Sequence, residues 1–179
     1  MYFAALLART EDGWEASDTE LDEVETLADL ADLAREAAED DEPVLVCIEQ
    51  EGAWFGVVRV EGEDDPRIFV SDAAAAARSS YGEILLTDEL LGRDPDDGDD
   101  LDLLVDLDGT EDGDPVQGDE DDEDGAEAVG SVPAGPVGDT GLLADFGLGE
   151  KDLLSLTSHD ALSEIADALG CTDMLEAVR

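Results

Sequence analysis

The stretch VLVCIEQEGAWFGVVRV, residues 44–60, contains two apolar runs rich in β-branched and aromatic residues, separated by a short polar turn with Gly52. This pattern predicts a β-hairpin. Upstream, YFAALLART at residues 2–10 predicts a mostly buried strand, with a short second strand pairing back onto it at Trp14–Ala16. Downstream, Arg67–Val70 predicts a further strand. Strands that follow one another through tight turns predict an antiparallel meander sheet.

Two segments carry the signals of helices that would cover this sheet. Thr26 followed by Asp29 is typical of a helix N-cap with an acid in the first turn, and the apolar residues after it recur at helical spacing. Ser71 or Asp72 is placed to cap a second, alanine-rich helix. The sequence therefore predicts an α+β domain over residues 1–92, an antiparallel meander sheet with helices on one face.

The charge of the chain is concentrated after this domain. The 179 residues carry a formal net charge of −44, and residues 94–139 contain 19 acidic side chains and no basic one. This part is rich in Asp and Gly and has too little apolar surface to offset the conformational entropy of folding, about 1–2 kcal/mol per backbone residue. We expect a disordered acidic linker over residues 93–140.

The remaining residues, 141–179, predict a small C-terminal helical segment. Apolar residues recur at helical spacing from Leu162, Thr157 and Asp160 have the spacing of a capping box, and Gly170 supplies a C-terminal stop. Because about forty residues form only a thin core, we expect this segment to pack either on the first domain or on another protein.

The composition excludes several classes of ligand. Nucleic-acid binding depends on Lys and Arg displacing counterions, and anionic membranes attract basic segments, so neither surface suits this chain. No apolar stretch approaches the roughly 20 residues of a membrane span, and the apolar N-terminus has no basic region before it. We expect a cytoplasmic protein in which Cys47 and Cys171 are reduced and mostly buried.

One acidic motif resembles a phosphate-handling site. LLVDLDGT, residues 103–110, is similar to the nucleophile loop of haloacid-dehalogenase-type phosphatases, with Asp106 as nucleophile and Asp108 as acid/base. That chemistry needs a nearby lysine and a large α/β core, but the only lysine is Lys151 and no such core surrounds the motif. A metal-dependent phosphatase-like hydrolase is therefore the alternative interpretation.

Other metal patterns are incomplete. An acidic run in the linker imitates the opening of an EF-hand loop but has Ser131 where the bidentate glutamate should stand. His159 is the only histidine, and neither cysteine belongs to a C-x-x-C pair, so the zinc pattern of nucleobase deaminases is absent. We predict no catalytic residue, no cofactor and no dedicated metal site.

Partner binding is the preferred class of function. Trp54 and Phe55 must face opposite sides of their strand, so that one lies in the helix-covered core and the other packs on the second face or anchors a partner beside Arg59 or Arg67. The acidic linker offers six further candidates, which are Asp119, Glu120, Asp121, Asp122, Glu123 and Asp124.

One resemblance rests on four stretches, which are YFAALLART with Trp14-Glu15, AWFGVVRV at 53–60, RIFVSD at 67–72 with the alanines after it, and the tail 144–178. Together they are similar to one family, the actinobacterial tRNA adenosine deaminase-associated proteins. The resemblance covers both ordered pieces and includes no catalytic motif. It implies a neighbour or partner of the enzyme that converts the wobble adenosine of tRNA to inosine, without deaminase activity of its own. We therefore expect a non-enzymatic acidic accessory protein that partners or regulates the deaminase by binding its basic surface.

Overall fold

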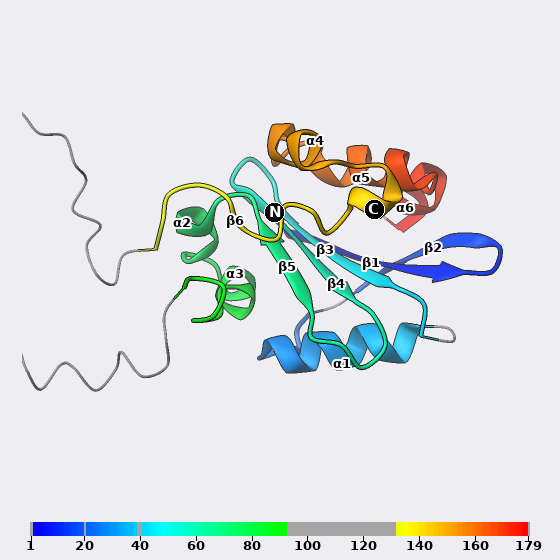
Figure 1. The fold of residues 1–179 in the computed structure, drawn as a ribbon, viewed down its shortest axis with the longest axis horizontal. Coiled ribbons are helices and arrows are strands. Elements are labelled where there is room, and N and C mark those ends of the chain that lie inside the picture. The colour runs from blue at the N-terminus through cyan, green and yellow to red at the C-terminus, as the bar shows by residue number, and fades with distance from the viewer. Residues whose placement is uncertain (1, 20, 39–40, 93–131, 179) are drawn as a thin grey trace, which may run out of the picture.

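The computed structural model describes residues 2–19, 21–38, 41–92 and 132–178. These residues form a six-stranded antiparallel sheet with helices on both of its faces (Figure 1). The strands are β1 (Tyr2–Thr10), β2 (Gly13–Asp18), β3 (Val44–Gln50), β4 (Trp54–Val60), β5 (Arg67–Val70) and β6 (Val137–Gly138). Their order is β2-β1-β3-β4-β5-β6, and every neighbouring pair is antiparallel, which confirms the predicted α+β class. The predicted meander is formed by β3, β4 and β5, whereas β1 lies between β2 and β3.

The helices divide into two groups along the chain. The first group is α1 (Leu27–Ala37), α2 (Ala73–Ala76) and α3 (Ser80–Leu85). The second group follows β6 and consists of the 3₁₀ helix η2 (Ala144–Phe146), α4 (Glu150–Ser155), α5 (Ala161–Leu169) and α6 (Thr172–Val178). None of the described helices is both long and apolar enough to cross a membrane.

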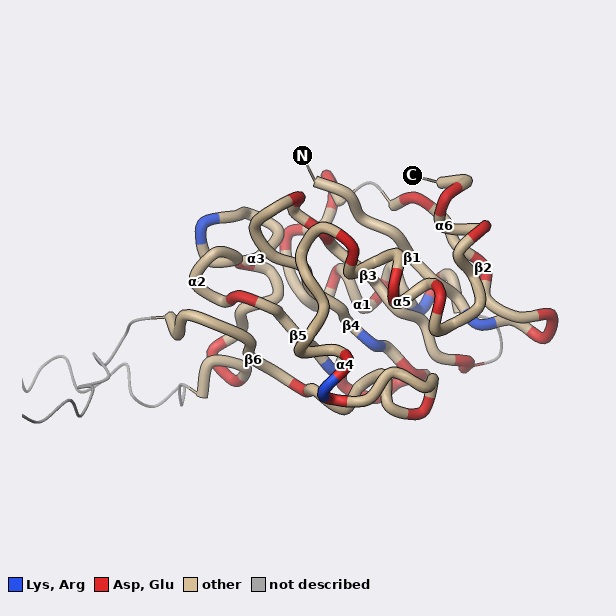
Figure 2. Tube along the Cα trace, turned by 90° about the horizontal axis from the view of Figure 1, so that it is seen from above, with Lys and Arg blue, Asp and Glu red and all other residues tan. Residues whose placement is uncertain are grey.

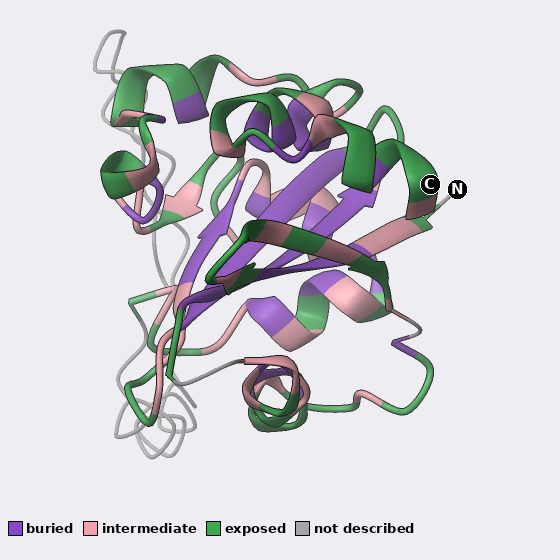
Figure 3. Ribbon diagram, turned by 90° about the vertical axis from the view of Figure 1, so that its right-hand side faces the viewer, coloured by how far each residue is buried: buried purple, intermediate pink, exposed green. Residues whose placement is uncertain are grey.

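The β3–β4 hairpin lies in the middle of the sheet. Its turn contains Gly52 at a φ of 73°, a backbone conformation that glycine adopts without steric cost. Apart from Gln50, every residue of the two strands is buried, because helices cover both faces of the hairpin (Figure 3). The hairpin predicted from residues 44–60 is confirmed.

The first group of helices covers one face of the sheet, as predicted. Side chains at even positions of the strands, such as Val46 and Val58, pack there against Leu30 of α1 and Leu85 of α3. The start of α1 is the predicted capping box, in which the Asp29 amide donates to the Thr26 hydroxyl at 3.2 Å and the Thr26 amide to the Asp29 carboxylate at 3.0 Å.

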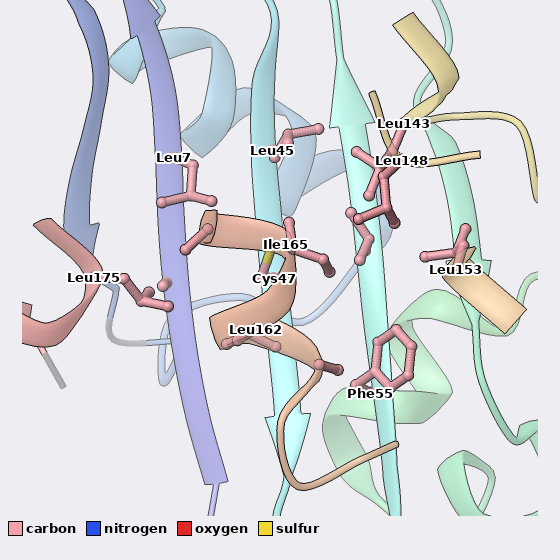
Figure 4. Close-up of a cluster of buried hydrophobic side chains, with 14 of the residues drawn as sticks. Leu7, Leu45, Cys47, Phe55, Leu143, Leu148, Leu153, Leu162, Ile165 and Leu175 are labelled. Atoms are coloured by element: carbon pink, nitrogen blue, oxygen red, sulfur yellow. The ribbon is translucent and has the colours of Figure 1, made fainter. Parts of the chain in front are cut away.

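The C-terminal segment, which we define as residues 141–178, covers the other face. Figure 4 shows its leucines and Ile165 lying over side chains at odd positions of the strands. Each fully buried aliphatic side chain contributes about 1.5–3 kcal/mol, so this layer supplies a core that forty residues alone could not build. Of the two expected arrangements, the structure shows packing on the first domain. The labelled side chains are Leu143, Leu148, Leu153, Leu162, Ile165 and Leu175 from the segment, and Leu7, Leu45, Cys47 and Phe55 from the sheet.

Sheet pairing resumes before the expected end of the linker at residue 140. Val137 and Gly138 form β6 and pair with β5, and the Asp139 amide donates to the Ile68 carbonyl at 2.8 Å. The expected boundary is therefore corrected, because backbone hydrogen bonds that need no apolar side-chain pattern add these residues to the sheet. Residues 93–131, which we call the acidic segment, lie outside the described residues.

Two helix boundaries also differ from expectation. The alanine-rich helix ends at Ala76, short of the Ser80 that its pattern allows it to reach, and Ser79 starts a separate helix by accepting a hydrogen bond from the Gly82 amide at 3.3 Å. The capping box expected at Thr157 and Asp160 is wrong, since α5 begins only after Asp160, whose side chain makes no capping hydrogen bond.

Candidate partner-binding surface

Trp54 and Phe55 lie on opposite faces of β4, as their adjacent positions require. Trp54 packs on the α1 side, where its indole donates to the Gln50 side chain at 2.8 Å, and Phe55 packs beside Phe69 under the C-terminal segment. Both side chains are completely buried. The alternative in which one of them anchors a partner at the surface is corrected, because the C-terminal segment covers the second face.

Arg59 joins the sheet to the C-terminal segment. Its side chain is only 5% exposed, and Nη1 donates to the Leu142 carbonyl at 2.7 Å. Nη2 contacts the carboxylates of Glu61 at 2.8 Å and Asp145 at 2.7 Å, and the guanidinium lies 4.7 Å from the ring centre of Phe146. This arginine therefore binds within its own chain, and its expected contact with a partner is corrected.

Arg59 and its carboxylate partners stabilise each other in their charged forms. Burial alone would lower the pKa of Arg59, but the hydrogen bonds and charges of its two carboxylate partners raise it above its usual value. The hydrogen bond and charge of Arg59 lower the pKa of Asp145. Phe146 also meets the ring of Trp14 edge-on at 5.1 Å, which extends the contact to β2. The contacts of Arg59 and Phe146 therefore stabilise the packing of the C-terminal segment on the sheet.

Arg67, in contrast, reaches the surface. Its side chain is 41% exposed, and both Nε and Nη2 donate to one carboxylate oxygen of Asp139 at 2.6 Å. It lines a cavity of about 620 Å³, which we call the Arg67 cavity. Asp65 and Glu89 add two further carboxylates, and Leu27, Ile68 and Leu90 add apolar surface.

The Arg67 cavity also lies between the two described ends that flank the acidic segment. One wall comes from Thr87 to Leu90, just before that segment, and another from Gly138 and Asp139, just after it. Of the candidates from the sequence, the six consecutive acids 119–124 and the motif with Asp106 and Asp108 lie outside the described residues.

The cysteines are free and buried, as predicted. Burial, followed by the neighbouring Cys171 and Glu49, raises the pKa of the Cys47 thiol to about 12, and burial also raises the pKa of Cys171. Because the thiolate is the reactive form, neither side chain is prepared for nucleophilic chemistry at neutral pH. His159 is exposed, and the described part of the chain holds no group of three or more His, Cys, Asp or Glu side chains placed to bind a metal ion.

Acidic residues far outnumber basic ones along the described chain (Figure 2). The described residues include 31 acidic and 6 basic side chains. Four of the basic ones are already ion-paired within the chain, which leaves Arg78 and Lys151 as the cations without an ion pair among the described residues. The excess negative charge is thus presented to solvent. The paired arginines are Arg9, Arg35, Arg59 and Arg67.

These features define a small acidic α+β protein whose described residues carry an excess of negative charge and several surface cavities. The family model for the Rv3753c-like tRNA adenosine deaminase-associated protein matches residues 2–172, and the chain belongs to this family. The resemblance inferred from the sequence is confirmed. A comparison with curated proteins and one with solved structures found no match.

Sequence reasoning missed three side chains that the fold brings to the surface together. The sequence places Tyr2 in a mostly buried strand, and no pattern singles out Tyr81 or Ile84. A signal was present, since aromatic residues make up only 4% of the chain and an aromatic near a strand end is a candidate surface anchor. Their arrangement is described below.

Proposed function

We propose that this chain is a non-enzymatic accessory protein that binds a basic surface of a tRNA adenosine deaminase. The family description names an association with that enzyme. The observation that carries the proposal is the imbalance of 31 acidic against 6 basic side chains in the described residues, with most of the basic ones paired internally. A surface of this kind attracts cationic partners by electrostatic steering.

A tRNA-modifying enzyme offers a complementary surface. Such an enzyme must present Lys and Arg to the phosphates of its substrate. An acidic protein can occupy the same region as the tRNA, and thereby regulate its access. The acidic segment adds 18 carboxylates to those of the folded part and strengthens the attraction.

The test measures binding of the full chain to the purified deaminase of the same organism by biolayer interferometry. We expect association at about 0.05 M salt that weakens steeply by about 0.5 M salt, because screening shortens the range of the attraction. A matched variant in which residues 94–131 are replaced by a Gly/Ser segment of equal length should bind more weakly and with a shallower salt dependence.

Two results would contradict the proposal. One is the absence of association at any ionic strength. The other is turnover of p-nitrophenyl phosphate with Mg²⁺ that disappears in Asp106→Asn, which would establish the phosphatase alternative. Competition by tRNA would further place the contact on the tRNA-binding face of the deaminase.

A further inference from the structure

Two adjoining cavities lie where the start of β1 meets α3. Their volumes are about 280 Å³ and about 120 Å³, and they share four lining residues. We call the two cavities together the tyrosine groove. The shared residues are Tyr2, Leu21, Asp22 and Tyr81, and the other lining residues include Val24, Ile48 and Ile84.

The groove displays aromatic surface that the fold leaves uncovered. The rings of Tyr2 and Tyr81 meet edge to face, 5.1 Å between centres and 77° between planes. The Tyr2 residue is 43% exposed, and Tyr81 and Ile84 are half-buried. Tyrosine combines a large apolar ring with a polar tip and is enriched among the residues that dominate binding energy in protein interfaces.

The wall formed by α3 is held in place by close packing. A Cβ on Gly82 would overlap the backbone carbonyl of Ala76, so α2 and α3 approach as closely as only glycine allows. Leu85, at the end of α3, is completely buried and lies over Gly56 of β4. The side chains of Tyr81 and Ile84 are thus presented from an ordered helix, which reduces the entropy lost when a partner binds.

Acidic residues predominate around the groove, although Arg78 lies two residues before the lining residue Ser80. The groove lining contains Asp22 and no basic residue. The segment that leads into α1 adds the exposed carboxylates of Glu23 and Glu25, and α3 adds that of Glu83. An apolar floor with an acidic rim complements a segment that carries one apolar anchor between lysines or arginines.

The Arg67 cavity continues this arrangement along the same two chain segments. The tyrosine groove lies between residues 19–24 and 80–84, and the Arg67 cavity between Leu27 and residues 87–90. Its Asp65 and Glu89 carboxylates therefore extend the acidic rim along residues 87–90. Carboxylates along this side of the molecule would attract a basic partner to it.

We propose that the tyrosine groove is the docking site for a basic segment of the deaminase. An aromatic or branched aliphatic side chain of that segment packs between Tyr2, Tyr81 and Ile84, and its flanking Lys or Arg side chains meet the carboxylates of Asp22 and its neighbours. This inference rests on the proposed function, because it names where the same partner binds.

The experiment compares single substitutions in the full chain, using the purified deaminase as the probe. Tyr2→Ala removes an exposed ring, so it should not affect folding, which a thermal melt verifies. We expect it to weaken binding by about tenfold or more, as truncation of an interface anchor does. The matched control is Leu154→Ala, an apolar residue of similar exposure (45%) on the opposite face of the sheet, which should change affinity by less than about twofold.

A second measurement does not depend on truncation. A photoreactive benzoylphenylalanine in place of Tyr2 should form a covalent link to the deaminase, and the same group in place of Met174 on α6 should not. A third variant, Asp22→Asn with Glu23→Gln and Glu25→Gln, should slow association and reduce its salt dependence.

The outcomes separate the two proposals. If the wild-type chain binds the deaminase but Tyr2→Ala binds equally well and no cross-link forms, the docking site is wrong and the proposed function stands. If the wild-type chain binds no deaminase at any ionic strength, both the docking site and the proposed function are wrong. If the wild-type chain alone self-associates and Tyr2→Ala does not, the groove belongs to a second copy of the chain, and the basic occupant is wrong.

Discussion

Replacing Arg59 by alanine tests how the C-terminal segment is held on the sheet. The substitution removes the hydrogen bond to Leu142, both carboxylate contacts and the guanidinium over the ring of Phe146. The Asp145 side chain is 57% exposed in the folded protein, so water can hydrate its carboxylate after the substitution. The Leu142 residue is completely buried, so its carbonyl is left without a hydrogen-bond donor. Most of the lost stability therefore comes from the buried Leu142 carbonyl and not from the exposed Asp145 carboxylate.

The magnitude follows from these contacts. An unpaired buried acceptor costs about 1–3 kcal/mol, and hydrogen bonds to charged groups contribute about 1.5–3 kcal/mol each. The cation over the aromatic ring adds about 0.5–2 kcal/mol. Because the two carboxylates recover hydration, we expect the free energy of unfolding to fall by about 3 kcal/mol, near the lower end for a broken buried ion pair.

The matched control is Arg67→Ala, which changes the cross-strand neighbour of Arg59 in β5. The exposed ion pair between Arg67 and Asp139 should contribute only about 0–1 kcal/mol to the free energy of unfolding. Urea unfolding gives the free energies, and hydrogen exchange followed by mass spectrometry locates the change. In Arg59→Ala, amide exchange should accelerate in the C-terminal segment before the central strands. Equal stability losses in the two variants, with unchanged exchange in residues 141–178, would refute this account.

Three further outcomes are expected. Because its arginine partner lowers the pKa of Asp145 in the folded state, the stability from this ion pair is complete above the ordinary value of 3.8 and is lost as the pH falls through the lower folded-state value. The difference in unfolding free energy between wild type and Asp145→Asn should therefore shrink as the solution is acidified from about pH 5 to about pH 2, and a constant difference would contradict the ion pair. Gly82→Ala should lower the melting temperature because its new methyl group meets the Ala76 carbonyl, whereas Gly141→Ala, where a Cβ has space, should not; equal melting temperatures would show that α2 and α3 are not closely packed. A maleimide should label Cys47 at neutral pH only after unfolding, since the thiol is buried and its pKa is raised to about 12, and rapid labelling of the native chain would disprove this burial.

Local patterns made much of the fold predictable. The hairpin at residues 44–60 depends on a turn and on runs of β-branched residues, and the start of α1 depends on Thr26 and Asp29, which bond to each other over three residues. The opposite orientation of Trp54 and Phe55 follows from the two-residue repeat of a strand. In each case neighbours in sequence determine the geometry.

The missed features depend on contacts between distant positions. Arg59 meets the carbonyl of Leu142, 83 residues further along the chain, and no pattern around either residue indicates this contact. Strand β6 contains only two residues and joins the sheet through its backbone. The tyrosine groove exists because β1 and α3 converge, which requires the whole sheet to be in place. The C-terminal segment explains why Phe55 is covered, and its sequence predicted helices but left two possible surfaces for them.

Strand β6 and the Arg67–Asp139 ion pair also determine where the chain returns after residue 131. The connection between Gly92 and β6 begins and ends at positions that the fold determines. The fold does not determine how many residues the connection contains. Closing a longer connection costs little, about 0.6 kcal/mol for each doubling of its length. Evolution can therefore lengthen or shorten the run of carboxylates without moving a single residue of the folded layers, and under the proposed function this would adjust the strength of the attraction to the partner.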